Sequence, residues 1–433
     1  MNELQSTISQ DAKDLSAWLE RIESFHPEEI KLGLSRIKDI ARLMDLLSPK
    51  AKVITVAGTN GKGSCVATLE SLALQSNLKV ACYTSPHLMV FNERIRVNGA
   101  NISDRQLNNA FDKIEICRGD TALTFFEFTT LAALQIFSTK KLDLIVLEVG
   151  LGGRLDAVNI IEPDVAIITT IAKDHTDWLG NSLEEIAAEK AGIYRFDSLN
   201  LVGDEKTFNL LKASLTDSNL QYELIESNQL NSIVSLDVIH DSQINIFQLK
   251  QQNIELALTS FINLFKDKSQ NIDLKQIFNR VAIAARFQTI QNKPQVIIDV
   301  AHNPQAALNL SNQIESLQCN GNRIAICGLM SDKAISEYIQ ILSETIDIWI
   351  FVDLPSQRGA LAKDLMDCLI DVSDIVNSQA EVLVEEASVH KCFNSISLAC
   401  DYVDKLIAPS DQLYVIGSFI TVSEFLKLEK EFN

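Results

Sequence analysis

Lys52-Val-Ile-Thr-Val-Ala-Gly58-Thr-Asn-Gly61-Lys62-Gly63-Ser64 is the stretch that decides the fold of this chain. An apolar run rich in β-branched residues stops at a turn of glycines, a lysine and a serine, and a helix-like segment, 65–75, follows. This order is typical of a strand, a phosphate-sized turn and a helix N-terminus. Glycines let backbone N–H groups converge on an anion, and the helix dipole adds partial positive charge. The pattern favours nucleotide binding, with Lys62 on the terminal phosphates and Ser64 as a Mg²⁺ ligand.

One residue departs from the usual phosphate-binding loop. That loop places a serine or threonine directly after the lysine, whereas Gly63 separates Lys62 from Ser64 here. A tight turn without a ligand is the alternative interpretation. The strand before the turn and the helix after it favour the nucleotide.

Length and charge set the broad class of the protein. A chain of 433 residues is too long for one ordinary core and predicts two domains. Its 57 acidic and 38 basic residues give a net charge of −19, which argues against a nucleic-acid-binding or membrane-binding surface. Anionic substrates would therefore need a local positive region.

The cysteines and the N-terminal residues predict a cytoplasmic protein. The eight cysteines form no Cys-x-x-Cys pair, and several lie in apolar runs, as reduced thiols do. The first residues are polar and lack the basic and apolar regions of a signal peptide, and no uncharged apolar run reaches transmembrane length.

Three further strand-like runs end in residues that carry chemistry. Residues 79–84 end at Ser85, residues 142–147 at Glu148, and residues 164–171 shortly before His175. Intervening helical stretches imply a parallel sheet, and such sheets bind ligands beyond the carboxyl ends of their strands. We therefore expect these three residues and Ser64 around one crevice, as Mg²⁺ ligands near a nucleotide. In the alternative interpretation Glu148 is only a charge at a strand end and His175 caps a turn.

The loops that follow these strands add cations and glycines. The segment Gly150-Leu-Gly-Gly-Arg154-Leu-Asp156 allows close backbone approach, offers a guanidinium to a carboxylate or phosphate, and adds a hydrogen-bond acceptor. Arg94 and Arg96 are expected on a loop after Pro86, where they add positive charge or are simply solvated. Lys190, in a helix predicted over 184–193, is by itself an ordinary lysine.

The remaining segments frame these motifs. Helical spacing covers much of 11–47, with a turn around His26, which we interpret as a surface residue. Residues 197–250 are polar and predict peripheral strands and loops, and Asn253 opens a helix that it could simply cap. A boundary is expected within 286–294. Beyond it, strands at 295–299, 323–328, 347–352 and 412–417 and a helix at 305–317 predict a second, smaller α/β domain.

Six motifs occur in an order that identifies a family. They are Gly58-Thr-Asn-Gly-Lys-Gly-Ser64, Ser85-Pro-His87, Leu147-Glu-Val-Gly-Leu-Gly-Gly-Arg-Leu-Asp156, Asp174-His-Thr-Asp177, Glu189-Lys-Ala-Gly192 and Asp299-Val-Ala-His-Asn-Pro304. Together they resemble the bacterial folylpolyglutamate synthases, including the bifunctional dihydrofolate synthase form. The resemblance runs from about residue 15 to Phe419. Gly63 belongs to the phosphate loop of that family.

The resemblance implies a fold and a reaction. The fold is that of the Mur-ligase-like superfamily: an N-terminal P-loop-type ATPase domain with a mostly parallel sheet, 1–288, and a smaller C-terminal Rossmann-like α/β domain, 289–433. The first domain would bind ATP, Mg²⁺ and the pterin, and the second would close on ATP and bind glutamate. The reaction joins L-glutamate to a pteroate or folate carboxylate through an acyl phosphate, with ATP becoming ADP and phosphate. Such chemistry needs positioned phosphates, neutralised charge and exclusion of water.

The resemblance also implies roles for individual residues. Lys62, Lys190, His175 and His302 would be catalytic, and Lys190 matches a lysine that is carbamylated (N6-carboxylysine) in the family. Two Mg²⁺ ions, and room for a monovalent cation, are implied with metal ligands Ser64, Ser85, Glu148 and His175. The ATP-binding positions would be Thr59, Asn60, Gly61, Lys62, Gly63, Ser64, Asn253, Arg286 and Asp299.

A third group of positions matches the acceptor site of the family. Phe125 or Phe126 would stack on the pterin, and Asp156 would pair with its nitrogens. The whole set is Ser24, Phe25, His26, Pro27, Thr124, Phe125, Phe126, Glu127, Arg154, Leu155, Asp156 and Ala157. Two residues depart from the family pattern: Val158 replaces a threonine, and Asn253-Ile-Glu255 replaces Asn-Ala-Ala.

The implied partners are small molecules: dihydropteroate, reduced folates, L-glutamate and ATP, acted on by a monomer. Rival functions are a Mur-type peptide ligase of the cell wall, a P-loop ATPase or kinase that phosphorylates a small molecule, and a non-catalytic nucleotide-binding module. The segments Ser85-Pro-His87 and Phe125-Phe-Glu127 argue against the Mur-type peptide ligase.

Overall fold

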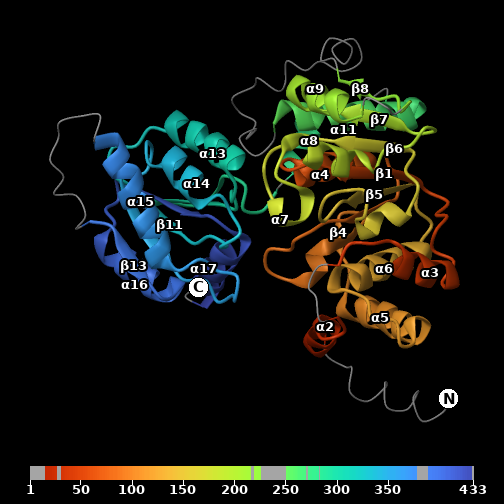
Figure 1. Ribbon diagram of the computed structural model, residues 1–433, viewed down its shortest axis with the longest axis horizontal. Helices are drawn as coiled ribbons and strands as arrows, with labels where there is room; N and C mark the ends of the chain where they lie inside the picture. The colour runs from red at the N-terminus through yellow and green to blue at the C-terminus, as the bar shows by residue number, and fades with distance from the viewer. Residues whose placement is uncertain are drawn as a thin grey trace. The chain divides into compact units, whose positions relative to one another are not determined.

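The computed structural model describes residues 15–26, 31–215, 219–225, 250–269, 272–281, 283–377 and 389–431. It divides into two compact units, each of which consists of helices around a sheet (Figure 1). The first unit comprises Met1–Ala172 and Asp177–Ala282, and the second comprises Lys173–Thr176 and Ile283–Asn433.

The first unit is built on an eight-stranded sheet in the order β4-β3-β2-β5-β1-β6-β7-β8. Strands β2, β5, β1, β6, β7 and β8 run parallel, and β3 and β4 form an antiparallel edge. The strand bounds are β1 Lys52–Ala57, β2 Val80–Tyr83, β3 Ile95–Val97, β4 Ala100–Asn101, β5 Leu144–Glu148, β6 Val165–Ile168, β7 Leu199–Val202 and β8 Glu223–Leu224.

Helices of this unit cover the sheet and extend from it. They are α2 Leu15–Glu23, α3 Ser35–Leu43, α4 Lys62–Gln75, α5 Asp104–Arg118, α6 Phe125–Ser138, α7 Thr176–Leu179, α8 Leu183–Ala191, α9 Glu205–Ser214, α11 Gln251–Leu264 and α12 Leu274–Arg280. Short 3₁₀ helices are η1 Phe91–Arg94, η2 Ala157–Ile160 and η5 Lys266–Lys268. Helix α4 packs on β1, β2 and β5, with α11 and α12 against it, and α6 packs on β2 beside α5.

Alternation along the central strands explains why both faces of this sheet are covered. Ala81 and Tyr83 of β2 belong to a core cluster with Phe128 of α6. Cys82, which lies between them, points to the opposite face and is fully buried. Strands buried on both faces read as continuous apolar runs, which is how β1 and β5 appear in the sequence.

The second unit has a six-stranded sheet in the order β13-β12-β11-β14-β10-β9, parallel except for the β9–β10 pair. Its strands are β9 Gln288–Asn292, β10 Gln295–Asp299, β11 Arg323–Cys327, β12 Ile348–Val352, β13 Lys391–Phe393 and β14 Gln412–Ile416. Its helices are α13 Pro304–Ser316, α14 Ile335–Leu342, α15 Ala362–Asn377, α16 Ile396–Leu406 and α17 Phe419–Glu431. The predicted α/β class, with a larger and a smaller sheet, is confirmed.

Three local predictions were wrong. The expected loop around Arg94 and Arg96 is the 3₁₀ helix η1 followed by strand β3. The interval 197–250 does contain outer strands of the main sheet, β7 and β8, but residues Glu205–Ser214 form helix α9, which was not expected. Asn253 does not cap its helix, because the N-cap of α11 is Lys250. In the described part of the chain no helix is long and apolar enough to cross a membrane.

An aromatic cluster under α6 offers a test of this packing. Phe128 is fully buried against Trp18, Phe25 and Phe111, with ring centroids 5.6–6.3 Å apart. We expect Phe128→Ala to lower the free energy of unfolding by about 3–5 kcal/mol, because it removes buried area and leaves a cavity. Chemical denaturation followed by circular dichroism measures the change.

Phe196 supplies the matched control for this substitution. Its side chain is 73% exposed, so Phe196→Ala should change the free energy of unfolding by less than about 0.5 kcal/mol. Equal effects of the two substitutions would contradict the assigned core.

Candidate active site

The glycine turn after β1 is held in a conformation that side chains would prevent. Gly58 has φ +145°, and a Cβ there would lie 1.9 Å from Oγ1 of Thr169. Gly61, at φ +92°, is the left-handed N-cap of α4. Both positions require glycine because L-residues rarely adopt these angles. At Gly63, by contrast, a Cβ would meet nothing within 4 Å, so the backbone of the first helical turn lies open.

Two threonines at the end of β6 fix the shape of this turn. The backbone N–H of Thr59 donates to Thr170 O (2.7 Å), and that of Asn60 donates to Thr170 Oγ1 (3.1 Å). The Thr169 hydroxyl donates to Asn60 O at 2.7 Å. The sequence analysis did not single out Thr169 or Thr170, because it placed both inside the strand-like run 164–171, whereas β6 ends at Ile168.

Two lysines from different elements converge on the turn. Lys62 Nζ donates to the carbonyl oxygens of Gly58 (2.9 Å) and Thr59 (3.2 Å). Lys190 Nζ of α8 donates to the same Gly58 oxygen at 3.2 Å, and its side chain is buried. The predicted phosphate lysine and the predicted modified lysine are thus neighbours.

The ends of β2 and β5 bring two of the predicted metal ligands together. The Ser85 N–H lies 3.3 Å from Oε2 of Glu148, whose carboxylate is buried. Burial, and then the charge of Glu148, raise the pKa of Cys65 in the first turn of α4, which places the carboxylate near the helix that carries Ser64. His175, the fourth predicted metal ligand, belongs to the second unit.

The oxygen donors fit a magnesium ion. A carboxylate and serine hydroxyls are the hard ligands that Mg²⁺ takes, and they leave room for waters. Within the described ranges no three His, Cys, Asp or Glu side chains gather in a metal-binding group. A site here would therefore need ligands beyond this chain's acidic and imidazole groups, such as serine hydroxyls and phosphate oxygens.

Asn253 of α11 lies directly against the glycine turn. A Cβ on Gly61 would come within 2.6 Å of its amide, so helix and turn are in close contact. Its Oδ1 is buried and has no hydrogen-bond partner in the described part of the chain. Because buried polar atoms are normally paired, this carbonyl is suited to accept a bond from a ligand.

Asp156 is a buried carboxylate in a loop of backbone donors. It accepts hydrogen bonds from the N–H groups of Leu151 (2.8 Å) and Val158 (3.0 Å). Burial raises the pKa of Asp156 to about 6, and the backbone donors, followed by the charge of Lys62, oppose this rise. Ala157 is also buried, and Leu155 is half-buried.

The predicted aromatic and capping residues gather at the start of α6. Phe126 stacks on Tyr83 with centroids 5.8 Å apart and fills the space at Gly150, where a Cβ would lie 2.5 Å from its ring. Phe125 packs edge-on against Phe91. Thr124 and Glu127 form a reciprocal capping box, and Glu127 also pairs with Arg36 at 3.0 Å. Thr124 and Glu127 therefore stabilise the N-terminus of α6, and Glu127 also forms an ion pair.

The guanidinium of Arg154 is already paired with a carboxylate. Its Nη2 and Nε lie 2.6 Å and 3.1 Å from Oε1 of Glu189, while its side chain is half exposed. Ser24 and Phe25 lie near the aromatic cluster: Ser24 Oγ donates to Arg21 O, and Phe25 contacts Phe128. His26 follows them in the chain, and Pro27 lies outside the described residues.

Within the second unit, Asp299 and Asp174 organise the remaining predicted residues. Asp299 accepts bonds from the N–H groups of Phe287 (2.7 Å) and Ala301 (2.6 Å), and its pKa is raised by burial against the opposing charge of Arg286. The Arg286 guanidinium lies over the Phe419 ring.

Asp174 collects cationic and amide groups. Lys333 Nζ donates to it at 2.6 Å, Asn303 Nδ2 at 3.2 Å, and His302 Nε2 lies 3.6 Å away. Although burial opposes ionisation, His302, His175 and Lys333 together hold the pKa of Asp174 far below its usual range. Lys333 was missed by the sequence analysis, because a lone lysine in a turn carries no motif.

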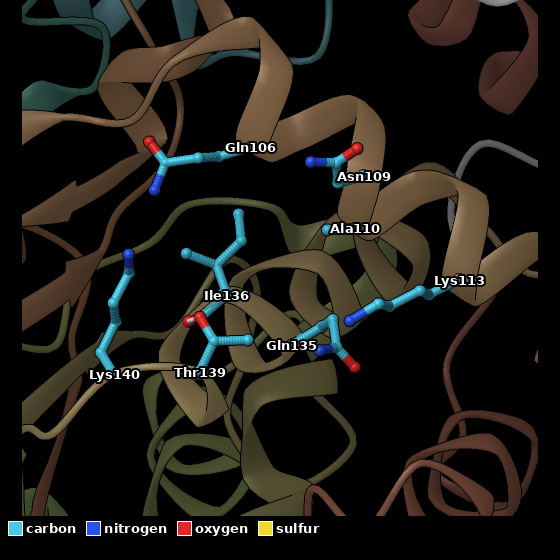
Figure 2. A pocket seen from close by; sticks show the side chains of 8 residues that line it. All are labelled: Gln106, Asn109, Ala110, Lys113, Gln135, Ile136, Thr139 and Lys140. Carbon is cyan, nitrogen blue, oxygen red and sulfur yellow. Dashed lines mark hydrogen bonds between the residues drawn. The ribbon is translucent and has the colours of Figure 1, made fainter.

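A hollow elsewhere on the first unit is separate from these residues. It lies between α5 and the C-terminal end of α6 and is lined by Gln106, Asn109, Ala110, Lys113, Gln135, Ile136, Thr139 and Lys140 (Figure 2). At about 1.5 Å per helical residue, Gln135 is roughly 15 Å along α6 from Phe125. None of the predicted site residues lines the hollow, so it is not the candidate active site.

Comparisons with known proteins match this arrangement over both units. Residues 56–265 match the Mur ligase middle domain, and residues 285–419 match the glutamate ligase domain of Mur ligases. The dihydrofolate synthase/folylpolyglutamate synthase of Escherichia coli is 36% identical over 427 residues, which is 97% of this chain and 96% of that protein. The enzyme of the same name from Haemophilus influenzae is 35% identical, over 95% of this chain and 96% of its own.

Solved structures carry the same names. The E. coli protein in complex with DHPP and ADP superposes with a TM-score of 0.83 at 33% identity, covering 98% of this chain and 99% of the other. The bifunctional enzyme of Yersinia pestis, complexed with AMPPNP and a Mn ion, gives a TM-score of 0.82 at 35% identity, with 97% and 99% covered. The resemblance drawn from the six motifs is confirmed. This chain belongs to the Mur ligase family, among the bifunctional dihydrofolate synthase/folylpolyglutamate synthases.

Proposed function

We propose that this protein is an ATP-dependent ligase that adds L-glutamate to dihydropteroate and to reduced folates. The observation that carries the proposal is the convergence of Lys62 and Lys190 on the glycine turn beside the buried Glu148. That turn is preorganised for an anionic, phosphate-bearing ligand, and relatives named for this reaction cover nearly the whole chain.

The reaction sets three demands on the protein. The acceptor carboxylate attacks the γ-phosphate of ATP to give an acyl phosphate and ADP. The amine of glutamate then attacks the acyl carbon, and phosphate leaves as the amide bond forms. Two anions must approach each other in the first step, the amine must be unprotonated in the second, and water must be kept from the acyl phosphate.

The glycine turn would supply the positive charge that lets the two anions approach each other. Its backbone N–H groups and the open first turn of α4 would receive the phosphates, and Lys62 would exchange its carbonyl partners for phosphate oxygens. Ser64, Ser85 and Glu148 would hold a Mg²⁺ ion, which supplies positive charge to the phosphate oxygens when bound. Asn253 would contribute its unpartnered amide oxygen to the nucleotide.

The acceptor would lie along Phe125, Phe126 and Asp156. Aromatic rings provide a stacking surface for the flat pterin, and the ionised Asp156 would accept hydrogen bonds from its ring N–H groups. The predicted roles of Arg286, Asp299, His302 and His175 toward ATP and glutamate stay predictions, as does carbamylation of Lys190.

We also propose a cytoplasmic location. All eight cysteines are free thiols in the structure, as is usual in a reducing compartment.

A coupled assay tests the proposed reaction. ADP release should require both dihydropteroate and L-glutamate, and mass spectrometry should show an acceptor heavier by one glutamyl residue. Tetrahydrofolate should replace dihydropteroate as acceptor. ADP release that ignores glutamate and yields a phosphorylated acceptor would establish a kinase instead.

Lys62 should be essential for turnover. We expect Lys62→Met to lower kcat by at least about 100-fold, because a positioned cation is lost from the charge that develops on the phosphates. The control is Lys113→Met in the remote hollow, which should keep turnover within about twofold. If Lys62→Met turned over like the wild type, the proposed phosphate contact would be wrong.

The pKa of Asp156 predicts how acceptor binding depends on pH. With a pKa of about 6, Asp156 is ionised at pH 7 and mostly protonated at pH 5, where it loses acceptor capacity toward the pterin. The KM for dihydropteroate should therefore rise about tenfold as pH falls from 7 to 5. Asp156→Asn should raise this KM at pH 7 and remove its pH dependence. A pH profile that is unchanged in the variant would show that another group titrates.

A further inference from the structure

Arg94 lies at the edge of the sheet where the predicted active-site residues gather. It ends η1 and directly precedes β3, and its carbonyl oxygen accepts a bond from the N–H of Thr84 at 2.8 Å. Thr84 is next to Ser85, whose N–H contacts Glu148. The backbone thus places Arg94 beside the carboxyl ends of β2 and β5.

The guanidinium of Arg94 is held rigidly by neutral groups. Its Nε donates to Nδ1 of His87 at 2.8 Å, and its Cζ lies 5.6 Å from the ring centroids of both Phe91 and Phe125. Because Nδ1 of His87 accepts this bond, it carries no proton, and the imidazole is a neutral partner. The groups in direct contact with the guanidinium therefore orient it without forming an ion pair.

The two terminal nitrogens of Arg94 have no hydrogen-bond acceptor or ion-pair partner among the described residues. The nearest acidic residue in the chain, Glu93, accepts from the N–H groups of Leu88 (2.8 Å), Met89 (3.0 Å) and Val90 (2.9 Å). Its carboxylate is therefore used to fold the loop.

Arg96, two residues further on, has a structural role, because its side chain is bonded to neighbouring groups of the protein. Its Nε pairs with Glu70 at 2.9 Å, and its Nη1 reaches Thr84 Oγ1 and Glu93 O, each at 3.3 Å. The two arginines lie on one short segment, and among the described residues only Arg96 forms a close ion pair with a carboxylate, while Glu148 and Glu93 act on Arg94 from a greater distance. Arg94 is the one left to meet a ligand.

We propose that Arg94 binds the reacting carboxylate of the acceptor substrate through its two terminal nitrogens. The proposal deepens the function proposed above and rests on it. The parallel N–H groups of a guanidinium fit a carboxylate as a two-bond pair. Phe125, whose ring Arg94 faces, belongs to the predicted acceptor site, which favours the acceptor over free glutamate.

A cation at this place serves the first chemical step. The carboxylate has to come close to the γ-phosphate, and two anions at contact distance repel each other strongly in a partly buried site. Arg94 would offset that repulsion and fix the direction of approach. In this step a bond forms between a carboxylate oxygen and phosphorus. Arg94 takes no part in that bond, so it would act as a substrate-binding residue.

A binding cycle with two ligands tests the contact directly. The probes are dihydropteroate and its carboxamide analogue, titrated by fluorescence against wild type, Arg94→Lys and Arg94→Met in the presence of a non-hydrolysable ATP analogue. Wild type should bind the acid at least about tenfold more tightly than the amide. In Arg94→Met this ratio should fall to about one, and in Arg94→Lys it should be intermediate.

Kinetics with two acceptors adds a second readout. Arg94→Met should raise the KM for dihydropteroate and for tetrahydrofolate alike, by at least about tenfold, while the KM for ATP stays within about twofold. Loss confined to tetrahydrofolate would overturn the proposal, since it would assign Arg94 to the carboxylate of the existing glutamyl group. An unchanged ratio of acid to amide affinity would overturn it as well.

Arg96→Lys provides the matched control. It weakens the pair with Glu70 and should lower the midpoint of thermal unfolding, yet it should leave the acid-to-amide ratio as in wild type. If both positions changed the ratio equally, the effect would belong to the local fold and not to Arg94. Absence of glutamate-dependent turnover in wild type would reject the proposed function, whereas active wild type with an unaffected Arg94→Met rejects only this contact.

Discussion

The close approach of Gly58 to Thr169 is the constraint on which the candidate site depends. Strand β1 lies between β5 and β6, with Val56 opposite Glu148 and Ala57 opposite Ile168. The chain leaves β1 toward α4 across the end of β6, and a Cβ at Gly58 would lie 1.9 Å from the Thr169 hydroxyl. Because this glycine turn passes so close, its carbonyl oxygen becomes the common acceptor for lysines from α4 and α8.

Much of this arrangement could be predicted from the sequence because it is local. Gly58, Gly61 and Lys62 lie within one turn, and the rule that ligands bind at the carboxyl ends of parallel strands brings Ser85 and Glu148 to the same edge. The structure places the N–H of Ser85 next to the carboxylate of Glu148. The order of the motifs then supplied the family, which no single motif could have done.

The parts that could not be predicted depend on pairing between distant segments. Strand β3 has three residues and gains its stability from hydrogen bonds to β2, so its short sequence carries little signal. The different contacts of Arg94 and Arg96 follow from their elements, since Arg94 ends η1 and Arg96 lies in β3, and the sequence analysis recognised neither element. Lys333 and Asp174 are separated by 159 positions, and nothing in either local sequence indicates their contact.

The way cations are held explains how an acidic protein can receive anionic substrates. Many cations of this chain, Arg96, Arg36, Arg154 and Lys333 among them, pair with carboxylates, so each pair adds no net charge to its surroundings. At the glycine turn, carbonyl oxygens accept from Lys62 and Lys190, and at the neighbouring end of β2 an imidazole accepts from Arg94. Neutral acceptors orient a cation and leave its field intact, and this field is strongest where water is excluded. A net charge of −19 on the whole chain is thus compatible with a local group of cations at this site, which backbone and imidazole dipoles help to orient.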